Sequence, residues 1–235
     1  MTVRKKKPPI EGHAFRNLLF FLLLYIVGSP FLDPYPSLSI FAHASLSVAL
    51  FVAIYTVQKQ QQERSVAIGL LLPLLILYWL GIYDIISFSR LAAYLFFTVY
   101  FGLLVYSYVW QIAHSRSVTL NVLYATFSLY LIIGLFWGSV YAVLNELSPG
   151  AYSGILLENL QGNTLHTFNY FSFVTLTTLG YGDIIPQTAG ASSLCQMEAI
   201  FGQFFTAVVV AWLVGMHVSS RHDAGHTKEL SQKEN

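Results

Sequence analysis

Charged residues and cysteine are scarce in this sequence. Asp, Glu, Lys and Arg make up 10% of the 235 residues, whereas a soluble domain usually carries about 25%. Together with 55% hydrophobic residues, this deficit excludes a soluble globular domain, a disordered chain and a nucleic-acid binder with a broad basic face. The single cysteine, Cys195, excludes an internal disulfide. The composition therefore predicts an integral membrane protein.

Apolar runs separated by polar breaks predict six transmembrane helices, because one span needs about 20 apolar residues. The first run is expected to end at Ser29-Pro30. Its basic start also suits a signal peptide, but no good cleavage site follows, which favours a retained membrane helix. The six runs cover approximately residues 14–28, 37–57, 66–87, 91–112, 120–147 and 189–218.

The basic residues predict the orientation of these spans. With the N-terminus inside, every Lys and Arg except Arg90 falls on the cytoplasmic side of a six-span topology. We therefore expect both termini in the cytoplasm of a cell that carries the protein in its plasma or inner membrane. The less apolar stretch 148–188 would then lie outside, or re-enter the membrane from that face.

Residues 175–183 read TLTTLGYGD, a pattern that suits a cation-conducting strand. A dehydrated cation needs oxygen atoms in place of its water shell. Successive backbone carbonyls point to one side only if left- and right-handed conformations alternate. Gly180 and Gly182 stand at alternate positions, where glycine adopts positive φ at little cost. The Thr178 hydroxyl would add a further ring of oxygens. Because one strand cannot surround an ion, about four chains must converge on an axis, which predicts a homotetramer.

The residues before this strand predict a short helix that dips back into the membrane. Asn163 or Thr164 would cap its N-terminus, and it would end near Thr177 with its negative dipole end facing a cation. The apolar residues surround it nearly completely, as expected for a helix wedged between others: Leu165, Phe168, Tyr170, Phe171, Phe173 and Val174.

Residues 118–220 resemble the pore domain of the tetrameric potassium-channel superfamily, with outer helix, pore helix, filter and inner helix in that order. The resemblance implies an all-α membrane fold with a re-entrant pore helix and a filter loop between spans five and six. It also implies K⁺ as the permeant ion, with no cofactor. The K⁺ ligands would be the carbonyls of Thr178, Leu179, Gly180 and Tyr181, with Gly182 closing the outer end. Leu179 replaces the commoner valine.

The same resemblance implies a set of residues that support the filter: Thr175, Thr177, Tyr170, Asp183 and Glu198. Asp183 would brace the outer mouth from behind, accepting a hydrogen bond from Tyr170 or another group. Glu198 is an ionisable group inside a membrane helix, and such groups are expensive there. It is interpreted as a hydrogen-bonded brace rather than a direct ion ligand.

The inner helix carries further candidates. Gly202 matches the hinge position of the family, although a glycine here also suits close helix packing. Gln203, Thr206 and Val210 share one helical face and would line the cavity, unless they make an ordinary helix–helix contact.

The first four spans form a predicted four-helix membrane domain over residues 14–117, flanked by a basic cytoplasmic N-terminus, 1–13. No Arg or Lys lies between Arg90 and Arg116, so the fourth span lacks the charges of a working voltage sensor. Asp84 and Arg90 would pair at the outer surface. Three polar side chains on the second span are expected to make interhelical hydrogen bonds rather than to form a binding site: His43, Ser45 and Ser47. The tail, residues 221–235, is short and cytoplasmic.

These observations predict a potassium-selective, weakly voltage-dependent channel that is embedded in lipid and binds no nucleic acid. A non-selective cation channel is the near alternative, although Gly180-Tyr181-Gly182 argues against it. A membrane haem or redox protein with paired histidines is a remoter one, because His114 and His217 lie near span ends. An enzyme is not expected, since the protease and hydrolase motifs His-Glu-x-x-His and Gly-x-Ser-x-Gly do not occur.

Overall fold

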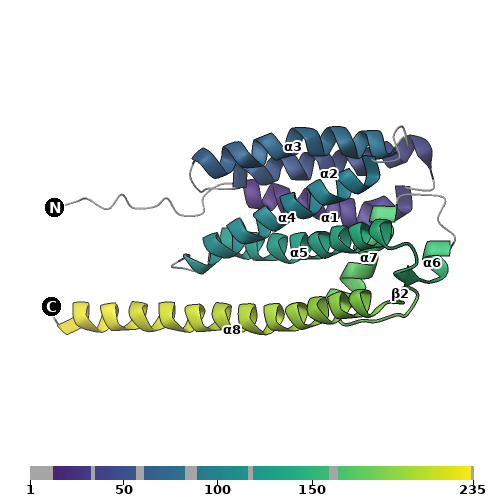
Figure 1. Ribbon diagram of the computed structural model, residues 1–235. Helices are drawn as coiled ribbons and strands as arrows, with labels where there is room; N and C mark the ends of the chain where they lie inside the picture. The colour runs from purple at the N-terminus through teal and green to yellow at the C-terminus, as the bar shows by residue number, and fades with distance from the viewer. Residues whose placement is uncertain are drawn as a thin grey trace.

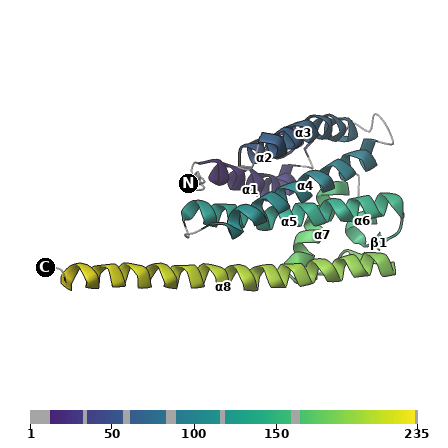
Figure 2. The same ribbon diagram turned by 60° about the vertical axis from the view of Figure 1, so that its left-hand side comes forward.

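The computed structural model describes residues 13–32, 35–56, 61–82, 89–115, 119–158 and 164–233, and these residues are almost entirely helical (Figure 1). Four helices form the N-terminal half: α1 (Ala14–Leu32), α2 (Pro36–Thr56), α3 (Gln61–Ile82) and α4 (Ser89–Ala113). The helices α1 and α4 lie against α5 (Leu120–Leu147), whereas α2 and α3 lie farther from it (Figures 1 and 2).

The second half is built around α5. A short strand β1 (Tyr152–Ser153) and a single-turn helix α6 (Ile155–Glu158) follow it. Then come α7 (Thr164–Leu176), the strand β2 (Ile185–Pro186) and the long helix α8 (Ala189–Lys233). The short helix α7 lies between α5 and α8, and the far end of α8 lies opposite the strands (Figure 1).

Five described helices are long and apolar enough to cross a membrane: Ala14–Leu32, Leu38–Thr56, Arg90–Ala113, Leu120–Leu147 and Ala189–Trp212. The expected third span is represented by α3, whose apolar part, Ile68–Leu80, is shorter. Residues 83–87 of that expected span lie outside the described residues. These helices coincide with the apolar runs of the sequence. Helix α5 also has an N-cap, because the Thr119 side chain accepts a hydrogen bond from the Val122 amide at 3.3 Å.

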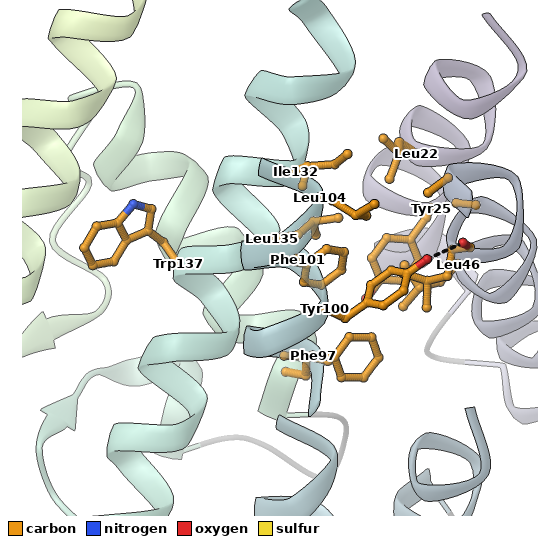
Figure 3. Packing of buried hydrophobic residues seen from close by; sticks show 14 of the residues in the cluster. Leu22, Tyr25, Leu46, Phe97, Tyr100, Phe101, Leu104, Ile132, Leu135 and Trp137 are labelled. Atoms are coloured by element: carbon orange, nitrogen blue, oxygen red, sulfur yellow. Dashed lines mark hydrogen bonds between the residues drawn. The ribbon is translucent and has the colours of Figure 1, made fainter. Parts of the chain in front are cut away.

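Large aromatic side chains fill the core between the N-terminal helices and α5 (Figure 3). Phe97, Tyr100 and Tyr108 of α4 are fully buried. The Tyr100 hydroxyl donates a hydrogen bond of 2.6 Å to the Leu50 carbonyl, so its buried oxygen is satisfied. Trp137 of α5 belongs to the same core, and its ring is 6.3 Å from that of Phe201 in α8 (Figure 3).

Two predicted helix ends are wrong. The first span does not end at Ser29-Pro30, because α1 continues to Leu32 with Pro30 inside its last turn. Proline has a helical φ and removes only one backbone hydrogen bond, and Ser29 is buried in the packed structure. The last helix does not end near residue 218, because α8 continues to Lys233 through the expected tail. That tail contains residues with good helix propensity, such as Lys228, Glu229 and Leu230.

Candidate functional site

The segment between α7 and α8 ends close to the point where α5 ends. Strand β1, four residues after α5, pairs antiparallel with β2, two residues before α8. Helix α7 has 13 residues and a length of about 20 Å, which is shorter than the hydrocarbon core of a bilayer at about 30 Å. Residues 148–188 therefore begin and end at the same end of the α5–α8 helices.

The backbone of this returning segment alternates in handedness. Thr178, Gly180 and Gly182 have φ values of 58°, 60° and 77°. The alternation at the two glycines was predicted from the sequence, whereas the left-handed Thr178 was not, because a β-branched residue rarely adopts positive φ. Hydrogen bonds hold the start of the segment against α7: Thr178 N donates to Thr175 O at 2.9 Å, and Leu179 N donates to Val174 O at 2.9 Å.

The outer end of the segment is fastened through Asp183. The Tyr170 hydroxyl donates a hydrogen bond of 2.5 Å to one carboxylate oxygen of Asp183, and the Ile184 amide donates to the other at 3.0 Å. The predicted hydrogen bond between Tyr170 and Asp183 is thus present, and it ties the outer end of the segment to the middle of α7.

A fully buried carboxylate links three helices behind the segment. Glu198 of α8 has 0% of its surface exposed. It accepts a hydrogen bond from Tyr141 of α5, and the Ser172 hydroxyl of α7 lies 2.5 Å from its other oxygen. That hydroxyl is also 2.7 Å from the Gly134 carbonyl, so it can donate to either acceptor. Glu198 is therefore hydrogen-bonded, as expected for a brace, and its partners Tyr141 and Ser172 were not foreseen.

The candidate residues of α8 lie at the base of the segment. A Cβ on Gly202 would lie 2.1 Å from the Leu176 carbonyl oxygen, so a glycine is needed here for close packing against α7. The next residue, Gln203, donates a hydrogen bond of 3.2 Å to the Thr178 hydroxyl. Thr206 bonds to its own helix through the Gly202 carbonyl, and Val210 is exposed in the single chain.

Two of the expected supporting residues bond locally. The Thr175 hydroxyl donates to Phe171 O at 2.9 Å, and the Thr177 hydroxyl donates to Phe173 O at 2.7 Å. Both are bonds to the preceding helical turn, so these side chains secure the end of α7 rather than the strand beyond it.

Two glycines of α5 were not predicted from the sequence, although their spacing was a signal. A Cβ on Gly134 would lie 2.3 Å from the Phe173 ring, and a Cβ on Gly138 would lie 2.2 Å from the Asn169 carboxamide oxygen. Glycines four residues apart occupy one helical face and allow close approach of a neighbouring helix. Here that neighbour is α7, which lies directly on the bare backbone of α5.

The polar points of the second span divide into two groups. His43 makes the expected interhelical hydrogen bond, with Nδ1 2.6 Å from the Tyr78 hydroxyl. The expectation is wrong for Ser45 and Ser47, which donate to their own helix at Ala42 O and His43 O. Short hydroxyl side chains reach the carbonyl of the previous turn more easily than a neighbouring helix. Asp84 lies outside the described residues, and no group of three His, Cys, Asp or Glu side chains suited to a metal occurs within the described ranges.

Comparison with known proteins agrees with this geometry. Residues 125–218, from α5 to α8, match a family model described as "Ion channel". A 66-residue stretch is 33% identical to the TWiK family of potassium channels protein 7 of Caenorhabditis elegans; it covers 28% of this chain and 12% of that protein. No solved structure gives a significant match. The chain is thus a multi-pass membrane protein whose residues 125–218 are similar to ion channels, and part of it is similar to a potassium channel.

Proposed function

We propose that this protein is a potassium-selective channel in which residues 178–182 form the selectivity filter. The observation that carries the proposal is the alternation of left-handed conformations at Thr178, Gly180 and Gly182. Such alternation turns successive carbonyls toward one side, where they replace the water shell of a K⁺ ion. The ligands are the carbonyls of Thr178, Leu179, Gly180 and Tyr181, with Gly182 closing the outer end.

The functional unit of the proposal is a homotetramer. In the 18-residue apolar segment of α5, 56% of the residues are buried within one chain. In the corresponding segment of α8, only 11% are buried. The side chains of Leu179 and Tyr181 are 55% and 65% exposed. Three further copies around an axis would cover these surfaces and complete the ring of oxygens. In this assembly Gln203, Thr206 and Val210 line the cavity, and Gly202 serves as the hinge of α8.

The topology of the proposal has six spans, with α3 as the short third one and both termini in the cytoplasm. Residues 177–188 then lie toward the outer face of the plasma or inner membrane. The four N-terminal helices are a scaffold rather than a voltage sensor, because α4 carries no Arg or Lys after Arg90. Opening is therefore weakly voltage-dependent.

A flux assay tests the proposal. The full chain is reconstituted into liposomes, and reversal potentials are measured in mixtures of K⁺ and Na⁺. We expect them to follow the K⁺ gradient. Reversal potentials that ignore the difference between K⁺ and Na⁺ would instead favour a non-selective cation channel, and the absence of any cation flux would contradict both.

A further inference from the structure

The segment between α5 and α6 lies against the returning strand. We call residues 151–154 the outer strap. Its residues Tyr152 and Ser153 pair with Pro186 and Ile185, respectively, and Gln187 N donates a hydrogen bond of 2.8 Å to Ala151 O. Antiparallel ladders alternate hydrogen-bonded and non-hydrogen-bonded pairs, so Tyr152–Pro186 is a non-bonded pair. Proline therefore fits in β2 without the loss of a ladder hydrogen bond.

The outer strap touches the backbone of Asp183 at Gly154. This glycine has φ of 152°, and a Cβ there would lie 2.0 Å from the Asp183 carbonyl oxygen and 2.9 Å from the Ile184 Cα. Both neighbours are backbone atoms, so no side-chain rotation relieves the overlap. Asp183 thus has a hydrogen bond to Tyr170 at its carboxylate, and its backbone lies directly against Gly154 of the strap.

The first two residues of the strap are buried against α5 and α7. Ala151 is fully buried, and Tyr152 is 4% exposed. The Tyr152 ring packs against Tyr141, Phe168 and Phe171, with ring centroids 5.5, 5.3 and 5.7 Å away. Burial raises the pKa of the Tyr152 phenol, so this group stays neutral at ordinary pH. The contact at Gly154 is therefore anchored on α5 and α7, the helices that also carry the Glu198 partners.

From this arrangement we propose that the outer strap holds the exit of the filter in its conducting form, with Gly154 as the positioning residue. The inference rests on the proposed function. When the strap is displaced, Asp183 is released from its backbone side, and the carbonyls of Tyr181 and Gly182 turn away from the ion path. The channel then stops conducting, most readily when few external K⁺ ions occupy the exit and oppose that rotation.

The first test compares two glycines of the same loop. Gly154→Ala introduces the collision, whereas Gly150→Ala adds a Cβ at φ of 87° with no atom within 4 Å. Both variants carry the strain of alanine at positive φ, so their difference isolates the contact with Asp183. In planar bilayers we expect Gly154→Ala to shorten conducting periods about tenfold relative to Gly150→Ala at low external K⁺, and less at high external K⁺. Equal elution of both tetramers on gel filtration controls for folding.

The second test fastens the strap instead of disturbing it. Ser153 and Ile185 face each other across the two strands, so Ser153→Cys with Ile185→Cys places two thiols in register. Oxidation should lengthen conducting periods at low external K⁺, and a reductant should reverse the change. Ser153→Cys alone is the control and should not respond. An oxidised pair that conducts like its reduced form would overturn the proposal.

Amide hydrogen exchange separates this inference from the proposed function. We expect Gly154→Ala, but not Gly150→Ala, to accelerate exchange in peptides covering residues 180–186. If the parent protein carries no K⁺-selective current but this acceleration is seen, the proposed function is wrong and the mechanical contact remains. If the parent conducts K⁺ and the two variants agree in both conduction and exchange, the strap proposal is wrong.

Discussion

The N-terminal helices and the α5–α8 region pack by different means. Between α1–α4 and α5 the contacts come from large side chains, with Phe97, Tyr100 and Tyr108 completely buried. Around α7, close approach at glycines adds to the aromatic packing, because Gly134, Gly138 and Gly202 have other atoms where a Cβ would be. One region is packed by large side chains, and the other combines such packing with glycines that leave no room for a Cβ.

The difference shows where the fold requires precision. Aromatic rings and leucines can shift rotamers to absorb a small change in a neighbour, at a modest cost. A backbone carbonyl or Cα that lies where a Cβ would be cannot move away by a side-chain rotation. Backbone atoms of this kind lie next to Gly138, Gly154 and Gly202, so we expect residues 178–184 to tolerate less change than the N-terminal helices. Four experiments test this comparison.

The largest effect is expected at the filter. Gly180→Ala or Gly182→Ala places a Cβ at φ of 60° or 77°, which costs about 1–2 kcal/mol per residue in each of the chains around the pore. We expect K⁺-selective conduction to be abolished in both variants, as measured by reversal potentials in mixed K⁺ and Na⁺. Retention of parental selectivity in both would show that the alternating backbone does not coordinate the ion.

The comparison between the two regions is tested directly by a pair of glycines. Gly138→Ala would place a Cβ 2.2 Å from the Asn169 side-chain oxygen and 2.9 Å from its Cα, and should destabilise the protein by about 1–3 kcal/mol. Gly102→Ala in α4 meets only the Phe136 ring at 3.5 Å, so it should be neutral or stabilise by up to about 1 kcal/mol through helix propensity. Thermal unfolding in detergent measures both, and similar shifts would remove the distinction.

A smaller effect is expected from the brace. Tyr170→Phe removes the hydrogen bond to Asp183, and a bond to a charged group contributes about 1.5–3 kcal/mol. We expect faster loss of conduction during sustained opening, with selectivity retained, in single-channel recordings. The matched control is Tyr124→Phe in α5, whose hydroxyl makes no hydrogen bond to another described residue. If the two variants behave alike at every K⁺ concentration, Asp183 does not depend on Tyr170.

The smallest effect is expected at Arg90. One elementary charge moved through 100 mV is worth about 2.3 kcal/mol, and a sensor multiplies this by several arginines in each subunit. Arg90 is the only Arg or Lys in α4, so Arg90→Gln should leave a shallow conductance–voltage curve almost unchanged in symmetrical K⁺. A steep parental curve that Arg90→Gln flattens would show that the N-terminal helices do sense voltage.

The sequence was sufficient for features that depend on neighbouring residues. The bounds of α5 and the position of α7 follow from apolar runs and their polar ends. Positive φ at Gly180 and Gly182 follows from the residue type, and the bond from Tyr170 to Asp183 follows from a family resemblance. Each of these features is encoded within a short stretch or by a known pattern.

Features that join distant parts of the chain could not be predicted. Gly154 meets Asp183 across 29 positions, and Tyr141 meets Glu198 across 57. The residue type does not indicate the partner in either case, since glycine and tyrosine occur in many different contacts of membrane helices. The end of α1 was missed for a different reason, because Pro30 lies in the last turn of α1, where its fixed φ suits a helix and it removes only one hydrogen bond.

The contact of α8 with the base of the filter has a consequence for energetics. Gly202 lies on the Leu176 carbonyl, and Gln203 is hydrogen-bonded to Thr178, so two adjacent residues of α8 join it to the filter segment. A rotation of α8 that alters these contacts must change the free energy of the filter. In the proposed channel, an ion held in residues 178–182 would in turn bias the position of α8 by the same coupling free energy, because thermodynamic linkage is reciprocal. Under that proposal the identity of the permeating ion acts as an allosteric effector of α8.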